Sequence, residues 1–123
     1  MSLLTTIAAM GQGDVTPDAI DWGNISDTAS PIATATTTTE TFTGISAPID
    51  VRVTYTGSYL AVTYSLNGGG GTTLNSGDTI SIVNNDTLAF TFSANASTSG
   101  TATVINDSDG STTLDTFTVT LTV

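Results

Sequence analysis

The sequence contains neither cysteine nor histidine, and Arg52 is its only basic side chain. The missing cysteines exclude disulfides, thiolate nucleophiles and cysteine-ligated zinc, and the missing histidines remove the commonest general base and metal ligand. One basic side chain against 11 acidic ones gives a formal net charge of −10, which repels the phosphates of nucleic acids and the headgroups of anionic membranes. We therefore expect no cofactor, no metal site, and neither a nucleic-acid nor a membrane partner.

Long hydrophobic runs are also missing, so no segment approaches the length of a membrane-spanning helix. The opening residues, MSLLTTIAAM, lack the basic start of a signal peptide, and Thr5 and Thr6 interrupt their apolar run. We interpret residues 1–16 as an N-terminal arm of the mature protein that docks on this domain or on a neighbouring subunit. The candidate partner-binding residues in this arm are Leu3, Leu4, Ile7 and Met10.

From Ile20 onward, apolar and polar residues alternate with a period of two, which is typical of half-buried β-strands. In residues 51–55, for example, Val51 and Val53 fall on one face of the predicted strand and Arg52 falls on the other. The same alternation recurs in residues 60–66, 79–83, 88–92 and 117–123.

The segments between these strands carry residues that suit tight turns. Gly, Asn and Asp, which tolerate positive φ, occur in residues 56–58, 84–86 and 106–111, and residues 67–78 form one longer glycine-bearing connection. Seven or eight short strands separated in this way predict an all-β fold. We expect a single immunoglobulin-like, antiparallel β-sandwich over residues 17–123, preceded by the short arm.

Acidic side chains are the most numerous candidates for chemistry. Nearly all of them fall at strand ends or in turns, where we expect solvated carboxylates rather than the facing pair that a glycosidase needs. The segment from Asp107 to Ser111 resembles part of a calcium loop, but Ile105 and Thr116 stand where further ligands are required. We therefore expect a hairpin turn there, and no enzyme activity from the chain.

An aromatic platform that stacks on a sugar ring is another possible site. Tyr55 and Tyr64 fall on the apolar faces of their predicted strands, so we expect them in the core. Only Trp22 and Tyr59 then remain for a carbohydrate surface. For Trp22 we expect a position in or beside the first strand, where its ring covers the open end of the core and its N–H meets a polar partner.

Protection of the sheet edges is sparse in this sequence. Natural β-proteins protect edge strands with lysine, proline or inward-pointing charge, but residues 29–39 hold one proline and no charge, and residues 116–123 hold no charge at all. We expect these strands either to be central in their sheets or to be covered by another chain. This pattern favours a protein that is built into an assembly.

The sequence resembles the immunoglobulin-like modules of tailed-phage virion proteins over about residues 17–123. The first shared motif holds Asp21, Trp22, Asn24 and Ile25, and the second, Gly-Ile-x-x-Pro-Ile, spans residues 44–49. The resemblance continues through YSLNGG at 64–69 and NNDTLAF at 84–90. These motifs are structural, and no catalytic residue is implied by them.

This resemblance implies a structural protein of the virion, assembled in the cytoplasm of the bacterial host. A single module with its own leader favours a capsid decoration or cement protein. Its implied partners are the major capsid protein or other virion subunits, and copies of itself in a homo-oligomer. The alternatives are a tail, baseplate or fibre component and, from another class, a small carbohydrate-binding module. We expect Leu3, Leu4, Ile7, Met10 and Trp22 to be the partner-binding residues, although core packing alone is the commoner role for a residue such as Trp22.

Overall fold

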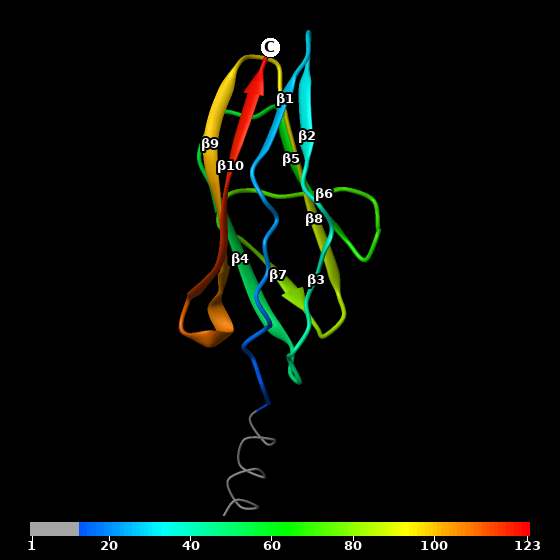
Figure 1. Cartoon of the computed structure of the whole chain (residues 1–123), viewed down its shortest axis with the longest axis vertical. Helices are drawn as coiled ribbons and strands as arrows, with labels where there is room; N and C mark the ends of the chain where they lie inside the picture. Colours follow the sequence, from blue (N-terminus) through cyan, green and yellow to red (C-terminus); the bar gives the residue numbers. More distant parts are fainter. Residues whose placement is uncertain (1–12) are drawn as a thin grey trace, which may run out of the picture.

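Two β-sheets face each other and enclose one hydrophobic core (Figure 1). The structure is a computed structural model that describes residues 13–123. One sheet, here called the β10 sheet, has the order β1 (Ile25–Thr28), β10 (Thr112–Thr122), β9 (Thr98–Asn106), β4 (Ile49–Tyr55) and β7 (Asp78–Ile82). The other, the β8 sheet, has the order β2 (Ala33–Thr36), β8 (Thr87–Ala94), β5 (Ala61–Leu66) and β6 (Thr72–Thr73), with β3 (Glu40–Thr41) also paired to β8.

This architecture confirms the predicted all-β sandwich. Within residues 13–123 the strands number ten rather than seven or eight, and two of the additional ones, β3 and β6, are only two residues long. All pairings are antiparallel except that of β1 with β10, which is parallel. In the described part of the chain, residues 13–123, no helix is long and apolar enough to cross a membrane.

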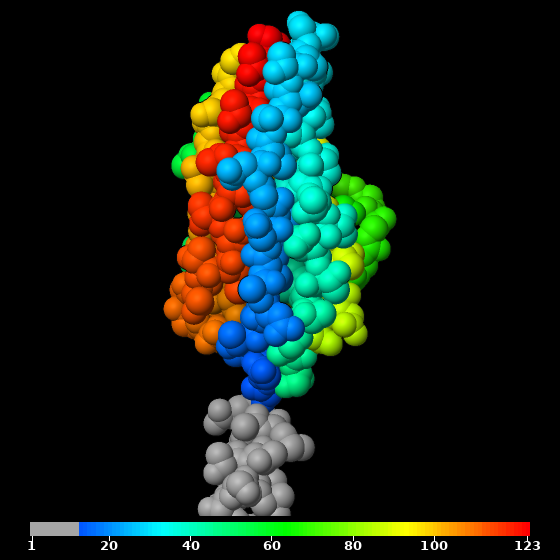
Figure 2. All heavy atoms as spheres, in the orientation of Figure 1, coloured from blue at the N-terminus to red at the C-terminus, as the bar shows by residue number. Residues whose placement is uncertain are grey.

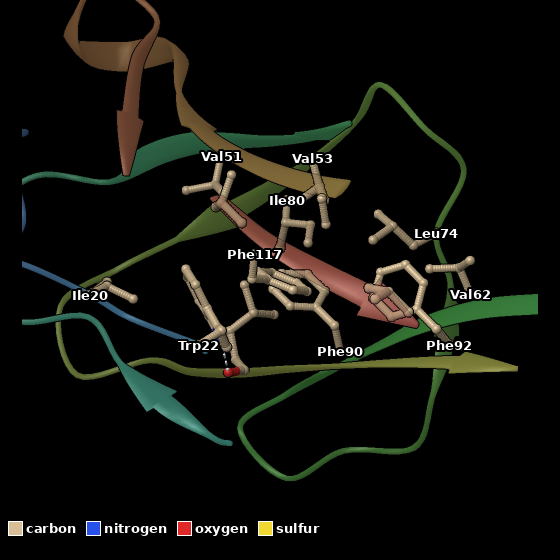
Figure 3. Close-up of a cluster of buried hydrophobic side chains, with 14 of the residues drawn as sticks. Ile20, Trp22, Val51, Val53, Val62, Leu74, Ile80, Phe90, Phe92 and Phe117 are labelled. Atoms are coloured by element: carbon tan, nitrogen blue, oxygen red, sulfur yellow. Dashed lines mark hydrogen bonds between the residues drawn. The ribbon is translucent and has the colours of Figure 1, made fainter. Parts of the chain in front are cut away.

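The alternation of the sequence becomes the two faces of each sheet. In β4, Val51 and Val53 are fully buried while Arg52 is only partly covered. In β10, Phe117, Val119 and Leu121 point inward and the threonines between them are exposed. Figure 3 shows the resulting row of side chains, which runs from Ile20 and Trp22 through Phe117 and Phe90 to Phe92, Leu74 and Val62.

The final strand, β10, is not an edge strand. Its uncharged residues are therefore paired on both sides, which is one of the two outcomes that the sequence predicted. It lies between β9 and β1, and the parallel register with β1 runs from Ile25 opposite Val119 to Thr28 opposite Thr122. The chain then crosses to the β8 sheet, where β2 begins at Ala33. A hydrogen bond links the two strands on either side of this connection: the Asp27 carboxylate of β1 accepts from the backbone N–H of Thr34 in β2 at 2.9 Å.

The turns use positive φ, as their composition predicts. Gly57, Asn85 and Gly110 have φ of 109°, 72° and 63°, and a short 3₁₀ helix, η1 (Asp107–Asp109), precedes Gly110. Two expectations for core residues were wrong: Leu60 and Val123 continue the apolar phase of their strands but are 55% and 38% exposed. Leu60 directly precedes β5 and Val123 directly follows β10, so neither belongs to a strand of the sandwich.

Gly100 of β9 lies against Thr56, the residue that follows β4. A Cβ at this position would collide with the carbonyl of Thr56, and Thr56 is itself fixed because its N–H donates to the carbonyl of Thr101 at 3.0 Å. Gly100→Ala should therefore lower the free energy of unfolding by about 2–3 kcal/mol, the usual cost of overpacking. Urea unfolding followed by the fluorescence of Trp22 measures this change. Gly70→Ala is the matched control because nothing lies within 4 Å of its added Cβ, and equal losses in the two variants would refute the steric argument.

Candidate functional site at the start of the sandwich

Residues 13–16 fasten the start of the described chain to one end of the sandwich. The N–H of Asp14 donates to Ser46 Oγ at 2.6 Å, and the N–H of Ser46 donates back to the Asp14 carbonyl at 2.9 Å. The side chain of Asn106, which is fully buried, donates to the carbonyl of Val15 at 2.7 Å. Thus the last residues of the predicted arm are bound to the sandwich, while the predicted boundary at residue 16 stays a prediction.

Four of the predicted partner-binding residues, Leu3, Leu4, Ile7 and Met10, lie outside the described residues. The structure does define the surface from which they depart. Gly13 lies directly against Ala47, at the rim of a hollow of about 300 Å³ whose lining carries no charge. Ile45, Ser46, Ala47, Pro48, Val83 and Asn84 line this hollow.

Val83 is the exposed apolar residue of this hollow, with 47% of its surface accessible. The alternation of residues 79–83 places Val83 on the outward face, where the other residues are polar. An apolar residue at such a position indicates an exposed contact surface, and the sequence prediction did not use this indication. Ser46 lies in the bend before β4 and Asn106 is the last residue of β9. Both anchor the chain beside Val83, and no motif distinguishes them from other polar residues.

Trp22 lies inside the core, along the seam between the sheets rather than at the core's open end. Its ring is 2% exposed and packs edge-on against Phe90, with 5.4 Å between ring centroids, and at a tilt against Phe42 at 6.0 Å. The indole N–H donates to the carbonyl of Leu88 in β8 at 2.9 Å (Figure 3), so the expected polar partner is present. A partner-binding role for Trp22 was wrong, because the ring has almost no surface to offer.

Residues 13–24, here called the strap, run along the seam between β10 and the strands β2 and β3. Figure 2 shows this segment, in blue, between the orange-red surface of β10 and the cyan surface of β2 and β3. The backbone N–H of Trp22 donates to the Asp115 carboxylate of β10 at 2.8 Å, and that of Asp18 donates to the Thr43 carbonyl at 2.9 Å. The strap is therefore hydrogen-bonded on both sides of the seam.

The carboxylates act as structural hydrogen-bond acceptors. All of them except Asp50 accept a hydrogen bond from within residues 13–123, mostly from the backbone of a neighbouring turn or from a threonine hydroxyl. Asp86, for example, accepts from the N–H of Val83 and from the amide of Asn67, at 2.9 Å each. Among these residues no group of three or more acidic side chains could hold a metal ion.

The aromatic side chains likewise face inward. Tyr59, the second candidate for a sugar platform, packs edge-on against Phe92 and Tyr55, and its hydroxyl donates to the Thr56 carbonyl at 2.7 Å. Burial raises the pKa of both Tyr55 and Tyr59. These two tyrosines do line a groove of about 450 Å³ together with Leu60, Val62 and Leu74.

Comparison with known proteins adds no functional assignment. No protein-family model and no curated protein sequence matches the chain. Among solved structures, the chain is similar to the adhesive subunit of CFA/I fimbria of enterotoxigenic Escherichia coli, with a TM-score of 0.43, 13% identity, and coverage of 85% of this chain and 45% of that one. A mutant of the same adhesin gives a TM-score of 0.43 at 10% identity, covering 88% of this chain and 46% of the adhesin.

A conjugative transposon lipoprotein from Bacteroides eggerthii gives a TM-score of 0.36 at 6% identity, covering 85% of this chain and 90% of that one. The chain thus spans less than half the length of the adhesin chains. At these scores and identities the similarities carry no argument about function.

Arg52, the only basic side chain, forms a two-point ion pair with Asp107 at the end of the sandwich where the strap begins. Nε and Nη2 of Arg52 donate to the two carboxylate oxygens at 2.9 and 3.1 Å. These hydrogen bonds lower the pKa of Asp107. The pair thus occupies the segment that resembled part of a calcium loop, and the hairpin turn predicted there is confirmed.

Arg52→Gln should raise the pKa of Asp107 toward its ordinary value. Since the pKa of Asp107 is lower in the folded than in the unfolded chain, the pair stabilises the fold above the unfolded value of about 3.9 and stops doing so as pH falls through the folded value. The small difference in free energy of unfolding between the two proteins should thus be present at pH 7 and vanish in strong acid. Urea unfolding across this range tests it, with Thr54→Gln on the same face of β4 as control. A difference that persists in strong acid would contradict this cause.

Proposed function

We propose that this protein is a structural component of a tailed-phage virion that decorates or cements the outer surface of the capsid. The sandwich would be an immunoglobulin-like module, and its partners would be the major capsid protein or neighbouring virion subunits, including further copies of itself. The shared motifs support this proposal through their structural roles. Trp22 and Asn24 fasten the strap, since Trp22 binds Leu88 and the Asn24 side chain accepts from the N–H of Thr118 at 2.9 Å.

The observation that carries the proposal is an apolar N-terminal sequence that joins the sandwich at a fixed point. Residues 1–12 carry Leu3, Leu4, Ile7 and Met10 and no charged side chain. They depart from Gly13, which is fixed by its neighbour Asp14 and by contact with Ala47. Burial of three or four such side chains against a partner contributes roughly 4–8 kcal/mol before the cost of ordering the segment. A segment of this length is too short to fold alone, so it suits docking.

The remaining surface also suits an assembled structural protein. Both sheets present threonine and serine outward, as in the hydroxyl contacts of Thr34 with Ser93 and of Thr36 with Thr91, each at 3.0 Å. The carboxylates are engaged in turns, and the aromatic rings are turned inward. A tail, baseplate or fibre component would use the same features at another place in the particle.

A carbohydrate-binding module remains the alternative from another class, and one observation favours it. The groove of about 450 Å³ beside Tyr55 and Tyr59 has hydroxyl and apolar groups in its lining. However, Tyr59 presents its ring to Phe92 and Tyr55, with centroid distances of 5.1 and 5.7 Å, and a sugar stacks on an exposed ring face. The groove thus supports this alternative less well than the N-terminal segment supports docking.

Deletion of residues 1–12 tests the proposed function. The deletion leaves Asp14, Val15 and their hydrogen bonds in place, so the urea midpoint should stay within error of the full chain. Binding to purified virions that lack this protein should fall at least about 100-fold, which corresponds to about 2.8 kcal/mol of lost contact, in a co-sedimentation assay.

A full-length chain with Thr5→Ala and Thr6→Ala is the control, because it keeps the apolar residues and should bind as the wild type does. Undiminished binding by the truncated chain would contradict the docking role of the segment. Unfolding of the truncated chain would show instead that residues 1–12 belong to the domain's own core.

A further inference from the structure

The edges of the two sheets are not equally protected. An edge strand exposes backbone N–H and C=O groups that can pair with another chain, and proteins limit this with charge, proline or very short strands. β1 carries Asp27, whose carboxylate bridges to Thr34 of β2, and Pro31 stands just before β2. β3 is two residues long and includes Glu40, and β6 is also two residues long.

β7 is the edge strand that lacks such protection. It spans five residues, pairs with β4 alone within residues 13–123, and keeps an unshifted register from Ile49 opposite Ile82 to Val53 opposite Asp78. It contains neither lysine nor proline. Figure 1 shows it beside β4, and it is the last strand in the order of its sheet. Its one charge is at its first residue, Asp78, whose carboxylate accepts from the N–H of Asn75 at 2.8 Å.

We propose that β7 pairs with β7 of a second copy of this chain, in antiparallel orientation, and so joins two β10 sheets into one continuous sheet. The side chains of β7 are compatible with such a continuous sheet. Ile80 and Ile82 are buried, at 3% and 0% exposure, and Thr79 and Ser81 are exposed on the outer face. A two-fold axis at Ile80 places Thr79 opposite Ser81 of the partner subunit. Hydroxyl side chains then continue the outer face, and isoleucines continue the inner one.

The same register keeps the one charge of β7 away from its copy in the partner subunit, in a chain whose net charge is −10. Asp78 lies opposite Ile82 of the partner subunit, so the two copies of Asp78 are offset by four residues, or about 13 Å, which exceeds the screening length of about 8 Å at physiological salt. On β4, Asp50 is opposite Ser81 and Arg52 is opposite Thr79. The pairing therefore puts Asp50 and Arg52 of the partner subunit in one row, but three strand spacings, about 14 Å, separate them, so their attraction is screened as well.

The exposed Val83 also finds a place in this register. It follows β7 directly and would lie opposite Gly77 of the partner subunit, a residue with open space where a side chain would be. Residues 1–12 fit β7 less well than a second copy does. Their apolar residues are consecutive at 3–4 and 7–10, so a strand built from them would place apolar side chains on both faces.

Pairing of five residues buries less than the roughly 1,200–2,000 Å² of a stable interface, so the dimer should be weak and reversible in solution. Sedimentation equilibrium of the full chain from micromolar to millimolar concentration should show concentration-dependent dimers. Thr79→Lys with Ser81→Lys places like charges opposite each other across the axis and should raise the dissociation constant at least about tenfold. Thr118→Lys with Thr120→Lys, on exposed positions of the central strand β10, is the matched control and should leave it unchanged.

The cysteine-free background allows a second measurement. Directly opposed residues of antiparallel strands have Cα atoms about 4.5–5.5 Å apart, within reach of a disulfide. Thr79→Cys with Ser81→Cys should therefore give covalent dimers on mild oxidation, and Thr118→Cys with Thr120→Cys should not. A wild type that stays monomeric throughout, or equal cross-linking of the two cysteine pairs, would overturn the proposal.

Deletion of residues 1–12 distinguishes the second copy from the N-terminal segment as the occupant of β7. Dimerisation should survive this deletion, and its loss would assign the contact to that segment and refute pairing through β7. These experiments use the isolated chain without particles. Their failure is thus separate from failure of the proposed virion function, which the particle-binding assay tests.

Discussion

The attachment of Trp22 to both sheets is the interaction on which the rest of the structure depends. Its backbone N–H is held by Asp115 of the β10 sheet and its indole N–H by Leu88 of the β8 sheet. Between these two hydrogen bonds the ring fills the core against Phe42 and Phe90. A buried indole without such an acceptor would leave a polar group unsatisfied at a cost of about 1–3 kcal/mol. Trp22 thus packs in the core and has both of its N–H groups hydrogen-bonded, one to each sheet.

This attachment makes the two sides of the sandwich unequal. On one side the strap, the β1–β10 pairing and the Asp27–Thr34 bridge close the seam between the sheets. On the other side β7 and the two-residue strand β6 form open edges, with the groove beside Tyr59 nearby. The strap also fixes the point of departure of residues 1–12, since its first residues are bound to Ser46 and Asn106. The closed side therefore fixes how the two sheets meet, and the two proposed contacts with other chains use residues 1–12 and the open edge of β7.

The sequence predicted what depends on local pattern, and it failed where distant segments decide. Alternation identified the inward residues of β4, β7, β8 and β10. In each of these strands successive side chains point in turn to the core and to solvent. It could not show that β1 pairs in parallel with β10, because that register is set by the crossing between the sheets. Nor could it place Trp22, whose burial depends on Asp115 and Leu88, both more than 60 residues away in the chain. Val83 was the detectable exception, since an apolar residue stood in the outward phase.

Hydrogen exchange at the indole N–H of Trp22, followed by NMR, tests this central role most directly. If the ring ties the sheets together, its N–H should exchange only when the whole domain unfolds, with the same free energy of opening as the slowest backbone amides of β8 and β10. The single tryptophan makes the signal unambiguous. Exchange at a free energy several kcal/mol below that of the strand amides would contradict the account, because the strap would then open while the two sheets stay together.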